Sequence, residues 1–342
     1  MTRVFLTGAS GFVAAHILRV LLNRGHSVVA SVRSQAKADQ IRRGYPEVPL
    51  SRLDFVVVDD FVREHAFEEA LTTTPPFEAV IHTTSPFQLQ PGSIDRDVLE
   101  PAVLGTTRLL EAVQAHAPSV RRVVITSSFF AAAKPAESTY LYSDADWNSL
   151  TDEQIQSNPV FAYIGSKIAA EKAAWDFIEK QNPSFTLTTI LPVLVFGPII
   201  HDVVSLEEVN VSAHLVRDLI TGEYKNEIPE SQLSRWVDVR DSALAHVRAI
   251  EVDEAGGKRF FASGGTYSNR EVADILWKHF PALRHKLPGP EVKSGGYPAA
   301  GVSKCDTELS RKILGVEYMS LEDSIVSMAG SLVGLYQPEF EV

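Results

Sequence analysis

The sequence is short of cysteine and of long apolar runs. Cys305 is the only cysteine among 342 residues, so no internal disulfide can form, which fits a reducing compartment. We interpret Cys305 as a packing thiol rather than as a nucleophile. The most hydrophobic run, residues 190–200, is broken by two prolines and a glycine, and no long apolar signal region opens the chain. These features predict a soluble cytoplasmic protein that does not bind membranes.

Excess positive charge and metal-ligand patterns are also missing. The formal net charge is -11, spread in small clusters such as Glu207-Glu208, which argues against a nucleic-acid surface. Any phosphate of a bound cofactor must therefore be met by local groups. The ten histidines show no metal-ligand spacing, so we predict no metal site. His82 falls on an apolar strand and is interpreted as a hydrogen-bonded core residue.

Short apolar segments alternate with helical patterns through the first half of the chain. Because these strands lack polar alternation, they indicate a parallel sheet covered on both faces: an α/β, doubly wound Rossmann fold. Ligands of such sheets bind beyond the carboxyl ends of the strands. The expected strands are 4–6, 28–32, 55–58, 79–82, 123–125 and 186–191, and the expected helices are 35–43, 64–71, 95–116 and 161–181.

The regular alternation decays after Pro192, which predicts a smaller, discontinuous C-terminal substrate domain. We expect residues 1–192 with 235–262 to form the dinucleotide-binding domain, and residues 193–234 with 263–342 to form the substrate domain. Helices are expected at 212–221, 242–251, 269–279 and 321–336, and strands near Trp236 and at 259–261. The Pro- and Gly-rich segment 288–301 is expected to be a long loop, a candidate lid over the substrate.

A glycine turn follows the first strand directly. Gly8, Gly11 and Ala14 are spaced three apart, at the point where a strand gives way to a helix. Glycine allows both the tight turn and a close approach of ligand to backbone, and the helix N-terminus faces an anion with its N–H groups. This pattern predicts a cradle for the phosphates of a dinucleotide.

The end of the second strand carries no acid. An NAD-binding fold would place an Asp or Glu there for the ribose 2′-hydroxyl, yet the chain reads Val32-Arg33-Ser34 and has no acid before Asp39. The guanidinium of Arg33 suits a 2′-phosphate, with Ser34 and Lys37 as additional donors. We therefore predict NADPH/NADP+ as the cofactor.

Tyr163 and Lys167 stand four residues apart at the start of an expected helix, so both lie on one face. A neighbouring ammonium favours the ionised phenol, which would bring the tyrosine pKa of about 10 closer to neutral for proton exchange with a carbonyl. Ser128 ends the fifth strand, where its hydroxyl either caps the next turn or orients a substrate carbonyl. A covalent serine nucleophile is disfavoured because no Gly-x-Ser-x-Gly elbow surrounds it.

Taken together, these stretches resemble the extended short-chain dehydrogenase/reductase superfamily, and within it the dihydroflavonol-reductase-like branch with its fungal NADPH-dependent aldehyde, ketone and methylglyoxal reductases. The matching stretches span nearly the full length: VFLTGASGFVAAHI, SVRSQAKA, IHTTSPF, RRVVITSSF, YIGSKIAAEKAAW, LPVLVFGP and WVDVRD. The resemblance implies that Ser128 orients the carbonyl and Tyr163 donates the proton. It also implies that Lys167 tunes Tyr163 and binds the nicotinamide ribose.

The same resemblance implies a set of cofactor contacts. Gly8, Gly11, Phe12 and Val13 would lie at the pyrophosphate, Arg33 and Lys37 at the 2′-phosphate, Asp60 at the adenine, and Thr83, Ser85, Pro192 and Val195 at the nicotinamide half. Asp59 adds a second acid where relatives often have a neutral residue, which leaves open which of the two meets the adenine. Phe87, Phe129, Phe130 and Trp236 are candidates for an aromatic substrate pocket, with plain core positions as the alternative.

The sequence thus predicts an NADP-dependent oxidoreductase that reduces aldehydes, ketones, diketones or ketoesters stereoselectively to alcohols. Two alternatives stay open at this point: a nucleotide-sugar epimerase or dehydratase, and a non-catalytic protein that senses NADPH. The expected partner is a small-molecule carbonyl substrate, and the expected state is a monomer or homodimer.

Overall fold

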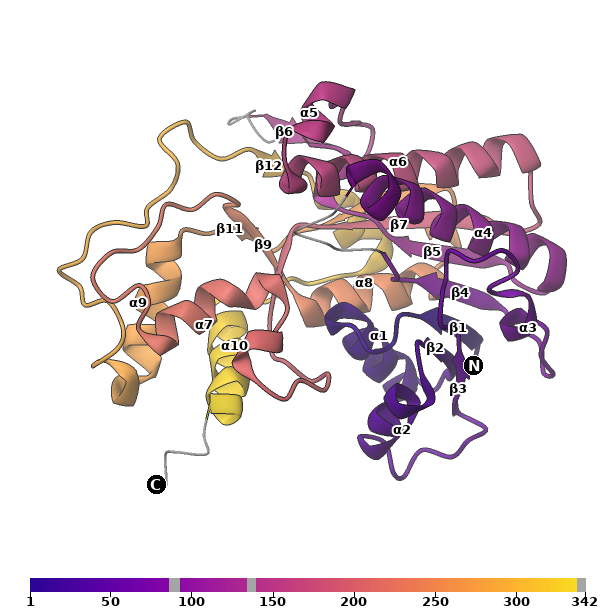
Figure 1. The fold of residues 1–342 in the computed structure, drawn as a ribbon, viewed down its shortest axis with the longest axis horizontal. Helices are drawn as coiled ribbons and strands as arrows, with labels where there is room; N and C mark the ends of the chain where they lie inside the picture. The colour runs from indigo at the N-terminus through magenta and orange to yellow at the C-terminus, as the bar shows by residue number, and fades with distance from the viewer. Residues whose placement is uncertain (86–92, 134–139, 337–342) are drawn as a thin grey trace.

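The computed structural model describes residues 1–85, 93–133 and 140–336. A parallel sheet of seven strands forms its centre, in the order β10-β7-β5-β4-β1-β2-β3 (Figure 1). Its strands are β1 (Arg3–Thr7), β2 (Ser27–Val32), β3 (Leu53–Val57), β4 (Ala79–His82), β5 (Arg122–Thr126), β7 (Thr186–Pro192) and β10 (Lys258–Ala262). The chain runs outward from β1 in both directions, so the predicted doubly wound α/β fold is confirmed.

Successive residues of the strands point to opposite faces of the sheet and pack into two separate hydrophobic cores. Val4 and Leu6 of β1 face one core, whereas Phe5 between them faces the other. The first core is covered by α1 (Phe12–Asn23) and α8 (Val239–Glu251), and α2 (Gln35–Arg43) lies beside them. The second is covered by α3 (Glu68–Leu71), α4 (Glu100–His116) and α6 (Pro159–Gln181). Both faces of the sheet are therefore covered along most of its strands, with exposed residues in the edge strand β3, and this burial explains why the strands lack polar alternation.

Two expected helices on the second face differ from the sequence interpretation. The helix expected at 64–71 is reduced to α3, and a π-helical segment, η1 (Asp95–Leu99), precedes α4. Pro101 lies in the first turn of α4, as expected, because that turn does not need its missing N–H. Leu109, Leu110 and Val113 are buried, whereas the candidates Leu99 and Val103 are only half-buried.

The C-terminal half adds a second unit around a third core. A small sheet contains β8 (Leu194–Phe196), β9 (Arg235–Asp238) and β11 (Gly265–Thr266). Figure 1 shows its helices α7 (His214–Thr221), α9 (Asn269–His279) and α10 (Leu321–Tyr336) grouped at the end opposite β1–β3. Because β9 pairs with β8 while β10 pairs with β7, the chain crosses between the two units more than once. The domain limits given above stay a prediction.

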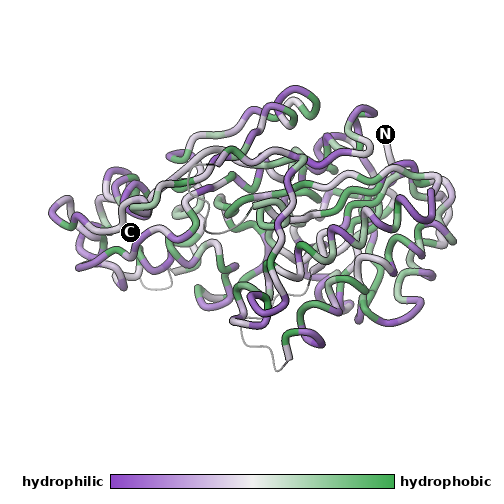
Figure 2. The backbone as a smooth tube through the Cα atoms, turned by 90° about the horizontal axis from the view of Figure 1, so that it is seen from above, coloured by the Kyte–Doolittle hydropathy of each residue, from purple (hydrophilic) through white to green (hydrophobic). Residues whose placement is uncertain are grey.

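Shorter elements complete the connections. The remaining strands and α-helix are β6 (Leu141–Tyr142), which pairs with β12 (Lys304–Cys305), and α5 (Asp152–Ser157). The short helical turns are η2 (Phe129–Ala131), η3 (Leu206–Glu208), η4 (Val211–Ala213), η5 (Asp253–Ala255), η6 (Pro281–Leu283) and η7 (Ser310–Leu314). Between Pro288 and Gly301 the chain forms neither helix nor strand, and its role as a lid stays a prediction. In Figure 2 the hydrophobic segments gather inside the molecule and the hydrophilic ones lie along its outer turns.

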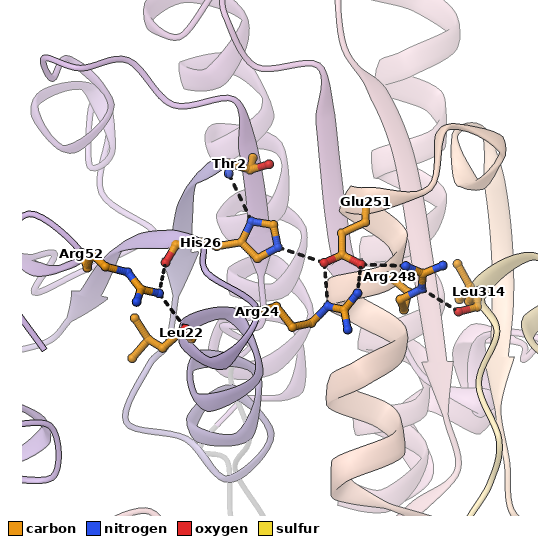
Figure 3. A network of polar contacts seen from close by, with 8 residues as sticks. All are labelled: Thr2, Leu22, Arg24, His26, Arg52, Arg248, Glu251 and Leu314. Carbon is orange, nitrogen blue, oxygen red and sulfur yellow. Dashed lines mark hydrogen bonds and ion pairs between the residues drawn. The ribbon is translucent and has the colours of Figure 1, made fainter.

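A half-buried carboxylate ties the ends of α1 and α8 together (Figure 3). Glu251 accepts two hydrogen bonds of 2.7 Å from Arg24, one of 2.9 Å from Arg248, and lies 3.0 Å from Nε2 of His26. Burial raises the pKa of Glu251, but the hydrogen bonds from Arg24, His26 and Arg248 outweigh this effect and hold the pKa at about 2. The network joins the first βα unit to α8, which comes more than two hundred residues later in the chain.

Burial also fixes the state of the single cysteine. Cys305 packs against the first core, and burial raises the pKa of its thiol to about 12. The interpretation as a packing thiol is consistent with this environment. Among the helices of the described residues, none is long and apolar enough to cross a bilayer.

Candidate active site

The glycine turn has the geometry that a close-fitting phosphate cradle needs. Gly8 has φ +72°, and a Cβ there would lie 2.9 Å from the hydroxyl oxygens of Thr83 and Thr84. Gly11 donates from its N–H to the Gly8 carbonyl at 2.9 Å and forms the N-cap of α1. Position 8 is therefore closed to a side chain both by its backbone conformation and by space.

The ends of β1 and β4 are joined by hydroxyl groups beside this turn. The Thr7 hydroxyl lies 2.8 Å from Nδ1 of His82 and accepts from the Thr83 N–H at 3.1 Å. Thr83 in turn donates from its hydroxyl to the Thr7 carbonyl at 2.7 Å. Burial lowers the pKa of His82 to about 3, so the ring is neutral. The sequence interpretation of His82 as a hydrogen-bonded core residue is confirmed, and Ser85 follows half-buried at the same edge.

The end of β2 presents exposed cations. Arg33 and Lys37 are both exposed, and neither has an ion-pair partner within the described ranges. The Ser34 hydroxyl caps α2 by accepting from the Lys37 N–H. Because no protein carboxylate neutralises these two side chains, they fit an anionic group such as a 2′-phosphate.

Asp59 and Asp60 lie exposed at the end of β3. Asp60 accepts from the Val62 N–H at 2.9 Å, whereas Asp59 lies 3.4 Å from Arg63. Both carboxylates therefore have local partners, and a contact of either with an adenine stays a prediction.

His201 is a residue that sequence reasoning missed. Its ring lies 5.6 Å from that of Phe12, in the first turn of α1, and the loop is tied down by a 2.9 Å contact between His16 Nε2 and the Pro198 carbonyl. Burial lowers the pKa of His201, Asp202 opposes this shift in part, and Lys37 adds a smaller lowering. Among the residues that the structure describes, none hydrogen-bonds its buried Nδ1. An unsatisfied buried atom between the glycine turn and Lys37 fits a site that takes a polar ligand.

Tyr163 and Lys167 lie one turn apart on α6, as their spacing predicts. Asn158 caps this helix by accepting from the N–H groups of Val160 and Phe161, both at 3.0 Å. The Lys167 ammonium nitrogen lies 5.8 Å from the centre of the Tyr163 ring. Tyr163 also hydrogen-bonds the Ser128 side chain at the end of β5. The fold thus brings all three predicted catalytic side chains together at the carboxyl edge of the sheet.

Electrostatics at this group differ from the sequence expectation. Burial raises the pKa of Tyr163 to about 12, and hydrogen bonding to Ser128 offsets only part of the increase. The expected lowering of the tyrosine pKa is therefore wrong for the chain by itself, because removal from water outweighs the hydrogen bond to Ser128. Burial likewise lowers the pKa of Lys167 to about 8, although Glu171 opposes this shift.

The candidate substrate aromatics are mostly inside the protein. Phe129 is 3% exposed in the first core, and Trp236 is 2% exposed, stacked on Phe196 in the third core. Phe130 is half-buried, and Phe87 lies outside the described residues. Lining of a substrate pocket by these side chains stays a prediction, as do the nicotinamide contacts of Pro192, at the end of β7, and Val195, in β8.

No cluster of three or more histidine, cysteine or acidic side chains suited to a metal ion exists in the described parts of the chain. The arrangement of Ser128, Tyr163 and Lys167 suits proton transfer to or from an oxygen.

Comparison with known proteins agrees with this geometry. The profile of the NAD dependent epimerase/dehydratase family matches residues 4–262. The ketoreductase azaE of Aspergillus niger is 38% identical over 331 residues, 95% of this chain and 97% of that protein. The NADPH-dependent methylglyoxal reductase GRE2 of Saccharomyces cerevisiae is 36% identical over 337 residues, 96% of this chain and 98% of that protein.

Solved structures give the same result. The crystal structure of yeast methylglyoxal/isovaleraldehyde reductase Gre2 complexed with NADPH has a TM-score of 0.87 and 34% identity, covering 98% of this chain and 99% of that one. The chain belongs to the NAD dependent epimerase/dehydratase family, that is, to the extended short-chain dehydrogenases/reductases.

Proposed function

We propose that this protein is an NADPH-dependent carbonyl reductase that converts aldehydes, ketones, diketones or ketoesters to alcohols. The observation that carries the proposal is the meeting of Ser128, Tyr163 and Lys167 at the sheet edge, beside a glycine turn closed to side chains. The names of azaE and GRE2 support the same reaction class.

The residues of the chain divide the binding of the cofactor among them. The N–H groups of the turn and of the first turn of α1 hold the pyrophosphate, and Arg33 with Lys37 holds the 2′-phosphate. Lys167 binds the nicotinamide ribose. The further proposed contacts are Gly8, Gly11, Phe12 and Val13 at the pyrophosphate, Asp60 at the adenine, and Thr83, Ser85, Pro192 and Val195 at the nicotinamide half.

In the reaction, the bound nicotinamide supplies a hydride to the carbonyl carbon. The Ser128 hydroxyl donates a hydrogen bond to the carbonyl oxygen and stabilises the charge that develops there. Tyr163 then gives its proton to that oxygen. A phenol pKa of about 12 keeps this proton in place at neutral pH until an alkoxide, a stronger base, forms next to it. The Lys167 ammonium stabilises the phenolate that remains.

Two other functions use the same scaffold. A nucleotide-sugar epimerase or dehydratase retains a tightly bound NAD, which the exposed Arg33 at the end of β2 does not favour. Recovery of NAD rather than NADP+ from the denatured protein would favour that alternative. A non-catalytic NADPH sensor would not need Ser128, Tyr163 and Lys167 to meet.

Purified protein with NADPH and a panel of aldehydes, diketones and ketoesters tests the proposal. We expect oxidation of NADPH with at least one class, faster than with NADH, and one predominant alcohol enantiomer by chiral chromatography. Absence of turnover with the whole panel, with NADPH still bound, would favour the sensor.

We also infer that the protein works in the cytoplasm as a monomer or homodimer. The single cysteine, held as a free, half-buried thiol, supports a reducing compartment. Light scattering after size-exclusion chromatography tests the oligomeric state.

A further inference from the structure

Glu171, one turn after Lys167 on α6, is a buried carboxylate surrounded by donors. Its residue is 2% exposed, and the side chains around it come from three other parts of the fold as well as from α6. The donors to its two oxygens are Ser127 Oγ at 2.5 Å, Thr189 Oγ1 at 2.7 Å, Arg259 Nε at 2.8 Å and Nη2 at 3.3 Å, and Trp175 Nε1 at 3.2 Å. Donors alone meet it, as suits an ionised carboxylate.

Arg259 is held equally firmly on its far side. Its Nη1 donates to the carbonyls of Asp144 at 2.8 Å and Asp146 at 2.5 Å, and its guanidinium carbon lies 3.8 Å from the centre of the Trp147 ring. The guanidinium therefore cannot swing away from Glu171 without losing three other contacts. The pair fixes α6 against β10, which is an edge strand of the main sheet. It also fixes α6 against residues 144–147, which precede α5.

Both catalytic elements adjoin this pair. Ser127, whose hydroxyl donates to Glu171, is the residue before Ser128. Lys167 precedes Glu171 by one helical turn, and Glu171 is the one charged group that raises its pKa. The other titratable groups around Lys167 carry no opposite charge, since His82 at the end of β4 is neutral and Tyr163 is a protonated phenol.

A purely mechanical clamp would not require charge at this position. Taking two ions out of water costs several kcal/mol each, and well-packed apolar side chains can hold two elements at least as well as a buried ion pair. A fixed carboxylate near a buried ammonium has an effect that an apolar pair lacks, because it favours the charged form of the amine.

We propose that Glu171, held in place by Arg259, is a positioning residue that keeps Lys167 charged beneath Tyr163 and anchors the strand end that carries Ser128. The inference rests on the proposed function, because a charged Lys167 matters only if Tyr163 exchanges a proton.

The charge of Lys167 can be read without turnover. NMR of protein with isotope-labelled lysine follows the titration of each side chain, and Lys167→Met identifies the resonance. We expect a midpoint of about 8 in the wild type, and a midpoint roughly one pH unit lower in Glu171→Gln. Glu179→Gln is the matched control, because it makes the same change at an exposed site of the same helix and leaves the midpoint unmoved.

Activity gives the second measurement. The upper pH limit of kcat/KM for carbonyl reduction should move down with the Lys167 midpoint in Glu171→Gln and stay in place in Glu179→Gln. Wild-type turnover and its loss in Tyr163→Phe test the proposed function separately. A failure of the proposed function can therefore be told apart from a failure of the role proposed for Glu171.

An unmoved Lys167 midpoint in folded Glu171→Gln would overturn the inference and leave the pair a structural contact. Should that variant not fold, Glu171→Gln/Arg259→Met removes both charges of the pair, so that neither partner is left buried without the other. The inference expects a lowered midpoint there too, because Glu171 and not Arg259 acts on Lys167. A wild-type midpoint in the folded double variant would contradict it.

Discussion

At the scale of single residues, burial decides the chemistry of the site. The spacing of Tyr163 and Lys167 identifies the pair, but it does not predict how far the two side chains are buried from solvent. Removal from solvent raises the pKa of the Tyr163 phenol from its ordinary 10.0 to about 12 and lowers the pKa of the Lys167 ammonium from 10.5 to about 8. The two groups therefore move apart in proton affinity, and the phenol holds its proton more tightly than the ammonium does. A protonated phenol is the form that a reductase needs as a proton donor.

Cofactor choice is also decided by single residues. In Arg33→Asp we expect the Kd for NADPH to rise roughly 100-fold, since a charge-assisted contact is lost and a repulsive charge is added. The Kd for NADH should change by no more than a few-fold. Fluorescence titration with both cofactors measures this.

Arg43→Asp is the control for that experiment, because it reverses an exposed charge at the other end of α2. It should leave both affinities unchanged. Equal losses of NADPH and NADH in Arg33→Asp would remove Arg33 from the 2′-phosphate site.

At the scale of elements, the sequence predicted well wherever the local pattern determined the structure. The apolar runs identified all seven strands of the main sheet, and the bounds predicted for α9 match the structure, in which Ser268 and Glu271 form a capping box at its start. The two-residue strands β6 and β12 were missed, since tertiary pairing rather than local pattern creates them. The six-residue α5 was missed because it buries no residue and so has no apolar face, although Thr151 and Gln154 form a capping box at its start.

The turn between β1 and α1 provides a test at this scale. Gly8→Ala places a Cβ at φ +72° and against two threonine hydroxyls, so we expect a loss of stability of about 1 kcal/mol or more and loss of NADPH binding. Thermal unfolding and cofactor titration measure the two effects.

Gly25→Ala separates strain from obstruction. Gly25 has φ +87°, but a Cβ there would meet nothing within 4 Å. This variant should lose a similar amount of stability and bind NADPH normally. Normal binding by a folded Gly8→Ala would show that the turn is not the phosphate cradle.

At the scale of the whole molecule, segments far apart in sequence complete the site. His201 reaches the first turn of α1 from a loop nearly two hundred residues later, and Glu171 meets Arg259 across α6 and β10. Contacts between residues so far apart in sequence leave no local sequence pattern. The sequence therefore predicted Ser128, Tyr163 and Lys167 as site residues but predicted neither His201 nor the ion pair of Glu171 and Arg259.

Three buried histidines, His16, His82 and His246, make the free energy of unfolding depend on pH. Burial lowers the pKa of His16 to about 4, of His82 to about 3 and of His246 to about 4. The unfolded chain then binds more protons than the native one between about pH 4 and 6.5, so the free energy of unfolding should fall as pH decreases through that window. Denaturant unfolding at a series of pH values measures the slope.

His246→Gln should reduce that slope, because His246 alone accounts for a loss on the order of 3 kcal/mol across the window. The exposed His285→Gln should not change it. A pH slope that is the same in both variants would mean that His246 does not titrate with the fold.

The most direct test of the account is turnover and cofactor affinity in Tyr163→Phe, which removes one hydroxyl from the centre of the site. General acid catalysis of this kind contributes roughly 100-fold to 10,000-fold, so kcat for carbonyl reduction should fall by at least that lower factor. NADPH affinity should stay within a few-fold, and Tyr224→Phe, on the C-terminal unit, should keep full activity. Near-normal turnover in Tyr163→Phe with NADPH bound would contradict the assignment of the proton donor.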